Sequence, residues 1–159
     1  GLEDLGRRAT VVARTYGWSG QMVDHLLHRY GSLLGDLVDA IADRPDLARP
    51  LEHAPAYLRA EIAYAATHEG VLHLEDVMLH RTRLNYEMRD RGLAALPEIA
   101  TLTGELLGWS AERVAAEMEN YTERARAEAD AEHQPDDAAA ETVRLGTPDV
   151  APMRILTAS

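Results

Sequence analysis

Residues 56–69 decide the fold; they read Ala-Tyr-Leu-Arg-Ala-Glu-Ile-Ala-Tyr-Ala-Ala-Thr-His-Glu. The spacing predicts a helix from about Ala56 to Glu69, which Gly70 ends. Leu58, Ile62 and Ala65 form one stripe, and Tyr57, Glu61, Tyr64 and His68 form a second stripe beside it. So little charge on any side indicates a central, buried helix. We therefore predict Glu61, His68 and Glu69 to be buried polar residues, and the first two need hydrogen-bonding partners.

Outward from this stretch the pattern remains helical on both sides. Apolar residues recur at helical spacing, and the helices they predict have clear ends: Gly17 and Gly108 as C-caps, Ser19 and Ser110 as N-caps. The predicted helices cover about residues 2–16, 19–30, 32–41, 56–69, 73–81, 93–106 and 110–125. Prolines interrupt residues 45–55, and no alternating pattern predicts a sheet. We predict an all-α fold: a single compact bundle of six or seven helices over residues 1–131, with an acidic, largely irregular tail at 132–159.

Composition limits the function further. The 159 residues hold 27 acidic and 16 basic side chains, a net charge of −11, and no Cys. Such a chain is not expected to bind nucleic acid, to form disulfides or to build a thiolate zinc site. Without an apolar run long enough for a membrane span, a cytoplasmic location is expected. The 29–32 turn between two helices superficially resembles a helix-turn-helix, but the helix after it is acidic.

The densest polar stretch runs from His68 to Arg91. His68 and His73 are five residues apart with Gly70 between them, which excludes the two-His helix face of a zincin. A site from His68, His73, Asp76 and His80 stays geometrically possible, but ion pairs along a short helix are the favoured interpretation. No glycine-rich nucleotide loop, nucleophile elbow or calcium loop occurs, so no catalytic, cofactor-binding or metal residue is predicted.

A series of short motifs is more informative than any one of them. In chain order they are Arg29-Tyr30-Gly31-Ser32, Tyr57-Leu58-Arg59-Ala60-Glu61, Ala65-Ala66-Thr67-His68-Glu69-Gly70, Leu74-Glu75-Asp76-Val77 leading into Arg81-Thr82-Arg83, and Leu107-Gly108-Trp109. Over about residues 5–126 this series resembles the C-terminal helical domain of FAD-dependent glycerol-3-phosphate dehydrogenases, which related oxidases share. The family often has two adjacent Arg before the Thr, whereas here His80 precedes Arg81.

The resemblance implies that the chain is part of an enzyme. The parent would oxidise glycerol 3-phosphate to dihydroxyacetone phosphate and pass electrons through FAD to a quinone, or to oxygen in the oxidases. FAD would be held by an N-terminal flavin domain of the same polypeptide, and the parent could lie peripherally on the cytoplasmic membrane. The isolated chain would not be catalytic. Neither the acceptor nor the oligomeric state follows from these residues.

Within that family this chain would be a helical cap that packs against the flavin domain and stabilises it. Arg81, Thr82 and Arg83 are the candidates for the contact, because Arg forms bidentate ion pairs at interfaces. Alternatively, both Arg pair inside the domain with Glu61, Glu69 or Glu75. A different alternative is a freestanding helical interaction module with no redox role. Reading the gene upstream of Gly1 for a dinucleotide-binding motif would separate the dehydrogenase from the module.

Overall fold

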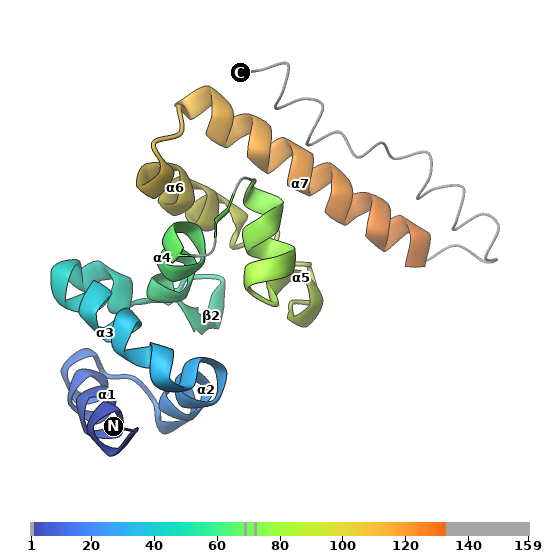
Figure 1. Cartoon of the computed structure of the whole chain (residues 1–159). Helices are drawn as coiled ribbons and strands as arrows, with labels where there is room; N and C mark the ends of the chain where they lie inside the picture. The colour runs from blue at the N-terminus through green and yellow to red at the C-terminus, as the bar shows by residue number, and fades with distance from the viewer. Residues whose placement is uncertain (1, 69, 72, 133–159) are drawn as a thin grey trace. The chain divides into compact units, whose positions relative to one another are not determined.

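The computed structural model describes residues 2–68, 70–71 and 73–132. Helices dominate these residues, which confirms the all-α class (Figure 1). The chain divides into two compact units, Gly1–Tyr64 and Ala65–Ser159. Seven α-helices lie in the described part of the chain, within the predicted six or seven, and the division into two units falls within this helical fold. The boundary falls inside one helix of ten residues, where the pattern of apolar side chains gives no sign of a break.

Unit 1 begins with three helices whose ends follow the sequence signals. Helix α1 (Leu2–Tyr16) ends at Gly17, whose φ of 72° is the left-handed conformation expected of a C-cap. Helix α2 (Gly20–Tyr30) starts after Ser19, whose hydroxyl accepts a hydrogen bond from the backbone N–H of Met22 at 3.1 Å. A 3-10 turn, η1 (Gly31–Leu33), leads into α3 (Leu34–Asp43). The three helices pack together in unit 1 (Figure 1).

A small hairpin follows that the sequence pattern does not predict. The 3-10 turn η2 (Pro45–Ala48) precedes strand β1 (Pro50–Leu51), which pairs antiparallel with β2 (Ala54–Leu58). Helix α4 (Arg59–His68) therefore starts three residues later than predicted. Pro55 favours an extended conformation for the residue before it, which agrees with a strand beginning at Ala54. Most of α4 is buried, as its composition indicates.

Unit 2 holds the remaining helices. After Leu74 and Glu75, residues Asp76–Arg81 form a π-helix, η3, where an ordinary helix is predicted. A single turn, α5 (Leu84–Glu87), and helix α6 (Leu96–Leu107) follow. Helix α6 starts three residues later than predicted, with Pro97 in its first turn, where a missing N–H costs nothing.

Helix α7 (Ala111–Glu132) completes the unit and packs against α6 (Figure 1). Gly108 ends α6 with φ 72°, and the Ser110 hydroxyl accepts from the backbone N–H of Arg113 at 3.1 Å. The two helices approach so closely that a Cβ on Gly104 would lie 2.6 Å from Val114. A glycine is therefore required at this crossing.

Each unit has its own apolar core. The largest fully buried aliphatic side chains are Leu26, Leu34, Leu37, Ile41, Leu51, Leu58 and Ile62 in unit 1, and Leu74, Met78 and Leu84 in unit 2. No helix among the described residues is both long and apolar enough to cross a membrane. Of the predicted tail, only Glu132 is described, as the last residue of α7. The rest of that prediction, residues 133–159, lies outside the described residues.

Candidate functional site

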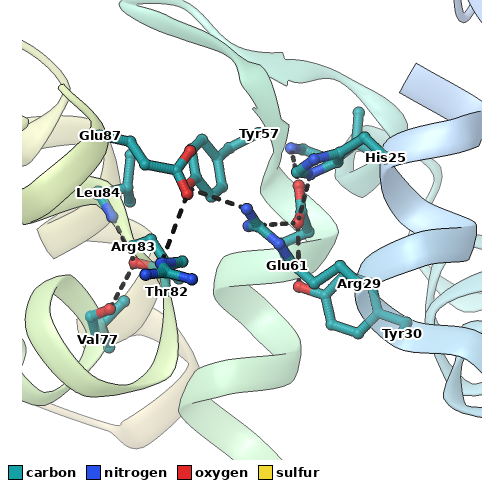
Figure 2. A network of polar contacts seen from close by, with 11 residues as sticks. His25, Arg29, Tyr30, Tyr57, Glu61, Val77, Thr82, Arg83, Leu84 and Glu87 are labelled. Carbon is teal, nitrogen blue, oxygen red and sulfur yellow. Dashed lines mark hydrogen bonds and ion pairs between the residues drawn. The ribbon is translucent and has the colours of Figure 1, made fainter. Parts of the chain in front are cut away.

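The most buried charged side chain of unit 1 is Glu61, which has no exposed surface. Its Oε2 accepts the backbone N–H of Leu58 at 2.7 Å, so it caps the start of its own helix in the manner of a capping box. Its Oε1 accepts from three groups of α2: His25 Nε2 at 3.2 Å, Arg29 Nη1 at 3.3 Å and the Tyr30 hydroxyl at 3.0 Å (Figure 2). The prediction that Glu61 is a buried polar residue with partners is confirmed.

Aromatic rings surround this Glu61 cluster, which consists of Glu61 and its three α2 donors. The Arg29 guanidinium lies 4.6 Å from the centre of the Tyr57 ring and donates to its hydroxyl at 3.3 Å. The His25 ring meets the same tyrosine edge-on at 5.7 Å. Burial by itself lowers the pKa of Arg29, but the Tyr57 hydrogen bond and the Glu61 charge outweigh it and raise that pKa. The guanidinium therefore stays a cation, and the cluster ties α2 to α4.

The other two predicted buried polar residues do not join this cluster. His68 is exposed, so its prediction is wrong. It lies in the last turn of α4, beyond the buried part of the helix, and its Nδ1 lies 2.9 Å from the Thr67 hydroxyl. Glu69 lies outside the described residues.

The predicted interface residues lie at the end of the π-helix of unit 2: Arg81 is its last residue, and Thr82 and Arg83 follow it. Thr82 is buried, with its hydroxyl donating to the Val77 carbonyl at 2.6 Å and accepting from the Leu84 N–H at 3.4 Å (Figure 2). Its side chain therefore lies inside the unit and not on the surface predicted for it. Arg81 and Arg83 are both exposed. Arg83 is 73% exposed and lies 3.9 Å from Glu87, a loose pair on one helical turn.

Sequence reasoning missed a second buried carboxylate, Glu117 of α7, which is 2% exposed. It accepts the backbone N–H of Leu74 at 2.7 Å and lies 3.2 Å from His73 Nδ1. Arg113 approaches it to 3.7 Å and stacks over the Trp109 ring at 4.5 Å. A signal was present: Glu117 lies four residues before Tyr121 and eight before Ala125, on the apolar stripe of the helix predicted over 110–125. The many other acidic residues of α7 concealed it.

A third group of buried polar side chains holds the loop after α5. The Tyr121 hydroxyl donates to the Arg91 carbonyl at 2.5 Å and accepts from the Asn85 amide at 2.9 Å. Arg91 has a left-handed φ of 59°, and its guanidinium pairs with Glu128 at 3.3 Å and Glu132 at 2.5 Å. These contacts compensate for the strained backbone of a non-glycine residue. Burial is the main cause that raises the pKa of Tyr121 to about 12.

These groups are suited to holding helices together. Among residues 2–68, 70–71 and 73–132, no three His, Asp or Glu side chains gather where they could hold a metal ion. The His25, Arg29 and Tyr30 donors are all directed at one carboxylate within unit 1. The exposed cations of unit 2 are therefore better candidates for contact with another molecule or domain.

Comparison with known proteins agrees with the motif series. The family model described as the C-terminal domain of alpha-glycerophosphate oxidase matches residues 4–114. The chain belongs to this family. It is 42% identical to the glycerol-3-phosphate dehydrogenase of Mycobacterium leprae (strain TN) over 138 residues, which are 87% of this chain and 24% of that protein.

More distant relatives bear the same name. Identity is 40% to glycerol-3-phosphate dehydrogenase 2 of Mycobacterium tuberculosis (strain ATCC 25618 / H37Rv), over 91% of this chain and 25% of that protein. It is 32% to a probable mitochondrial glycerol-3-phosphate dehydrogenase of Dictyostelium discoideum, over 62% of this chain and 15% of that protein. The chain thus spans about a quarter of the length of its mycobacterial relatives. No solved structure matches it significantly.

Proposed function

We propose that this chain is the C-terminal accessory domain of a longer, FAD-dependent glycerol-3-phosphate dehydrogenase. That polypeptide would oxidise glycerol 3-phosphate to dihydroxyacetone phosphate in the cytoplasm, or on the cytoplasmic face of the membrane, and pass electrons through FAD to a quinone. One observation carries the proposal: the family match over residues 4–114, together with relatives named glycerol-3-phosphate dehydrogenase of which the aligned residues make up only about a quarter.

The described residues do not fit FAD itself. Their strands form only a two-stranded antiparallel hairpin, with no parallel sheet and no glycine-rich strand-to-helix turn for a pyrophosphate. FAD would therefore be held elsewhere in the longer polypeptide. The role left to this chain is to pack against the flavin domain and stabilise it. Exposed Arg81 and Arg83 are candidates for that contact, as charged groups that can form bidentate pairs.

The test uses the longer polypeptide, identified by sequencing the gene upstream of Gly1. We expect a dinucleotide-binding GxGxxG near its start, bound flavin visible by absorbance, and glycerol 3-phosphate-dependent reduction of a quinone analogue. Hydrogen peroxide formation would indicate oxygen as the acceptor instead. Removing these 159 residues should speed the loss of flavin on heating. A start codon near Gly1, or no oxidation of glycerol 3-phosphate by the flavin-loaded polypeptide, would overturn the proposal.

A further inference from the structure

The turn after Thr82 places three large exposed side chains close together in the chain. Tyr86 is 68% exposed, the most of any large hydrophobic side chain among the described residues, and Arg83 and Arg89 are also exposed. The backbone N–H groups of Tyr86 and Glu87 both donate to the Arg83 carbonyl, at 3.0 and 2.8 Å, which closes one helical turn. Residues three apart on such a turn share a face, so Tyr86 lies next to Arg83.

The opposite side of this turn is firmly held within unit 2. Leu84 and Asn85 are buried, and Asn85 donates to the Tyr121 hydroxyl at 2.9 Å. At the end of the segment, a Cβ on Gly92 would lie 2.6 Å from the Met78 side chain, so the backbone is packed against the π-helix. A contact surface whose backbone is already ordered loses little entropy on binding, which favours affinity.

Charge indicates the chemistry of the partner. Residues 80–91 hold four Arg and two acidic side chains, in a chain with 27 acidic and 16 basic residues. Arg91 is paired with Glu128 and Glu132, and the Asp90 carboxylate accepts the backbone N–H groups of Gly92 and Ala94. The other three Arg of the segment, at 81, 83 and 89, outnumber its two acids, Glu87 and Asp90, by one charge. The segment is therefore slightly basic on a strongly acidic chain, and its complement is acidic.

We infer that Arg83, Tyr86 and Arg89, here named the Tyr86 surface, dock this chain onto an acidic surface of the remainder of the same polypeptide. This inference rests on the proposed function and extends its contact beyond Arg81 and Arg83. Tyr86 inserts its ring between apolar groups of the partner, and the two Arg pair with carboxylates beside it. Tyr and Arg are the residue types that most often dominate interface energy. The loose Arg83–Glu87 pair is easily exchanged for a closer partner.

The test places a photo-crosslinking phenylalanine analogue at position 86 in the longer polypeptide. We expect an intramolecular cross-link to a peptide that precedes residue 1 and contains Asp or Glu, located by mass spectrometry after digestion. A cross-link to residues 1–64 of this chain would overturn the inference. So would a cross-link between two polypeptides, seen as a doubled mass on a denaturing gel, or no cross-link at all.

Charge reversal at the flanking residues sharpens this test. Arg83→Glu with Arg89→Glu should lower the cross-link yield several-fold, because the acidic partner then faces like charge. Arg126→Glu is the matched control, an exposed Arg on α7 outside the surface, and should leave the yield unchanged. Equal effects of the two changes would overturn the inference. Activity is scored separately: the expected cross-link without glycerol 3-phosphate oxidation refutes the proposed reaction and keeps the surface, whereas oxidation without that cross-link refutes only the surface.

Discussion

Glu61 in unit 1 and Glu117 in unit 2 both cap the start of a helix, but they lie at very different sequence distances from the helix that they cap. Each is buried and accepts the backbone N–H of a residue at the start of a helix, Leu58 or Leu74, at 2.7 Å. Glu61 is three residues from the N–H it caps, whereas Glu117 is 43 residues away. A local cap can be recognised from sequence spacing, but a cap supplied from another helix cannot.

The two carboxylates also differ in what else they hold. Glu61 receives three side-chain donors, all from α2, and so joins two helices. Glu117 has His73, beside the helix it caps, and a more distant Arg113 at 3.7 Å. More groups lose their acceptor when Glu61 is removed, so unit 1 should depend more on its buried glutamate than unit 2 does.

The largest effect is expected for Glu61→Gln. The amide keeps the size of the side chain but presents N–H groups to donors and removes the charge that faces half-buried Arg29. Breaking such a pair costs about 3–5 kcal/mol, and we expect about 3 kcal/mol here because Arg29 is partly exposed. Urea denaturation of the 159-residue chain measures this loss of unfolding free energy.

The control is Glu3→Gln, at an exposed site in α1, which should change the free energy of unfolding by less than about 0.5 kcal/mol. A loss below about 1 kcal/mol for Glu61→Gln would contradict its central role.

Sequence reasoning located Glu61 because one acid on an otherwise apolar helix is conspicuous. The same argument failed for His68, since apolar spacing does not show where along a helix the burial stops. Thr82 was predicted on a different argument, its place between Arg81 and Arg83, which does not show that its hydroxyl is used by the backbone around the π-helix. Helix ends were predicted well where a single residue determines them, as at Gly17, Ser19 and Gly108.

Glu117→Gln is expected to destabilise the chain by about 2 kcal/mol, within the range for a buried hydrogen bond to a charged group. The Leu74 N–H keeps an amide oxygen as acceptor, whereas the His73 contact is weakened. The same urea experiment measures the change. Glu112→Gln, at an exposed glutamate on the same helix, is the control and should have little effect. If Glu117→Gln cost as much as Glu61→Gln, the number of donors would not explain the difference between the units.

The hairpin could not be predicted because its two strands lack the sequence features of strands. Strand β1 has only two residues, and prolines at 50 and 55 make the segment look like a loop. The register pairs Pro50 with Leu58 and Leu51 with Ala54. The segment lacks the alternation of apolar and polar residues that would predict such a pair of strands. Tyr57 was predicted to lie on a helix but lies in strand β2, where its side chain is buried in the core.

Tyr121 differs from the buried Glu61 and Glu117 because its acidic group, the phenol, is neutral in the folded state. Its pKa of about 12 lies above the ordinary value of 10 for a tyrosine. The unfolded chain therefore loses this proton first, so the stability is fully present below about pH 10 and is lost as the pH rises towards 12. At pH 11 the loss should be about 1.4 kcal/mol relative to pH 8. Tyr121→Phe should reduce that pH-dependent loss by the same amount in urea melts at both pH values; an unchanged loss would contradict the assignment.

The smallest effect should come from a buried polar group that no partner compensates. Among the described residues, the Thr103 hydroxyl on α6 is buried and has no hydrogen-bond partner. Thr103→Val replaces that hydroxyl with a methyl group of similar size and removes the cost of burying it, so it should stabilise the chain by about 1 kcal/mol. Thr101→Val, at an exposed site on the same helix, controls for the higher or lower helix propensity of Val. Both are measured by thermal and urea unfolding. A destabilised Thr103→Val protein beside an unaffected Thr101→Val protein would show that the Thr103 hydroxyl has a hydrogen-bond partner after all.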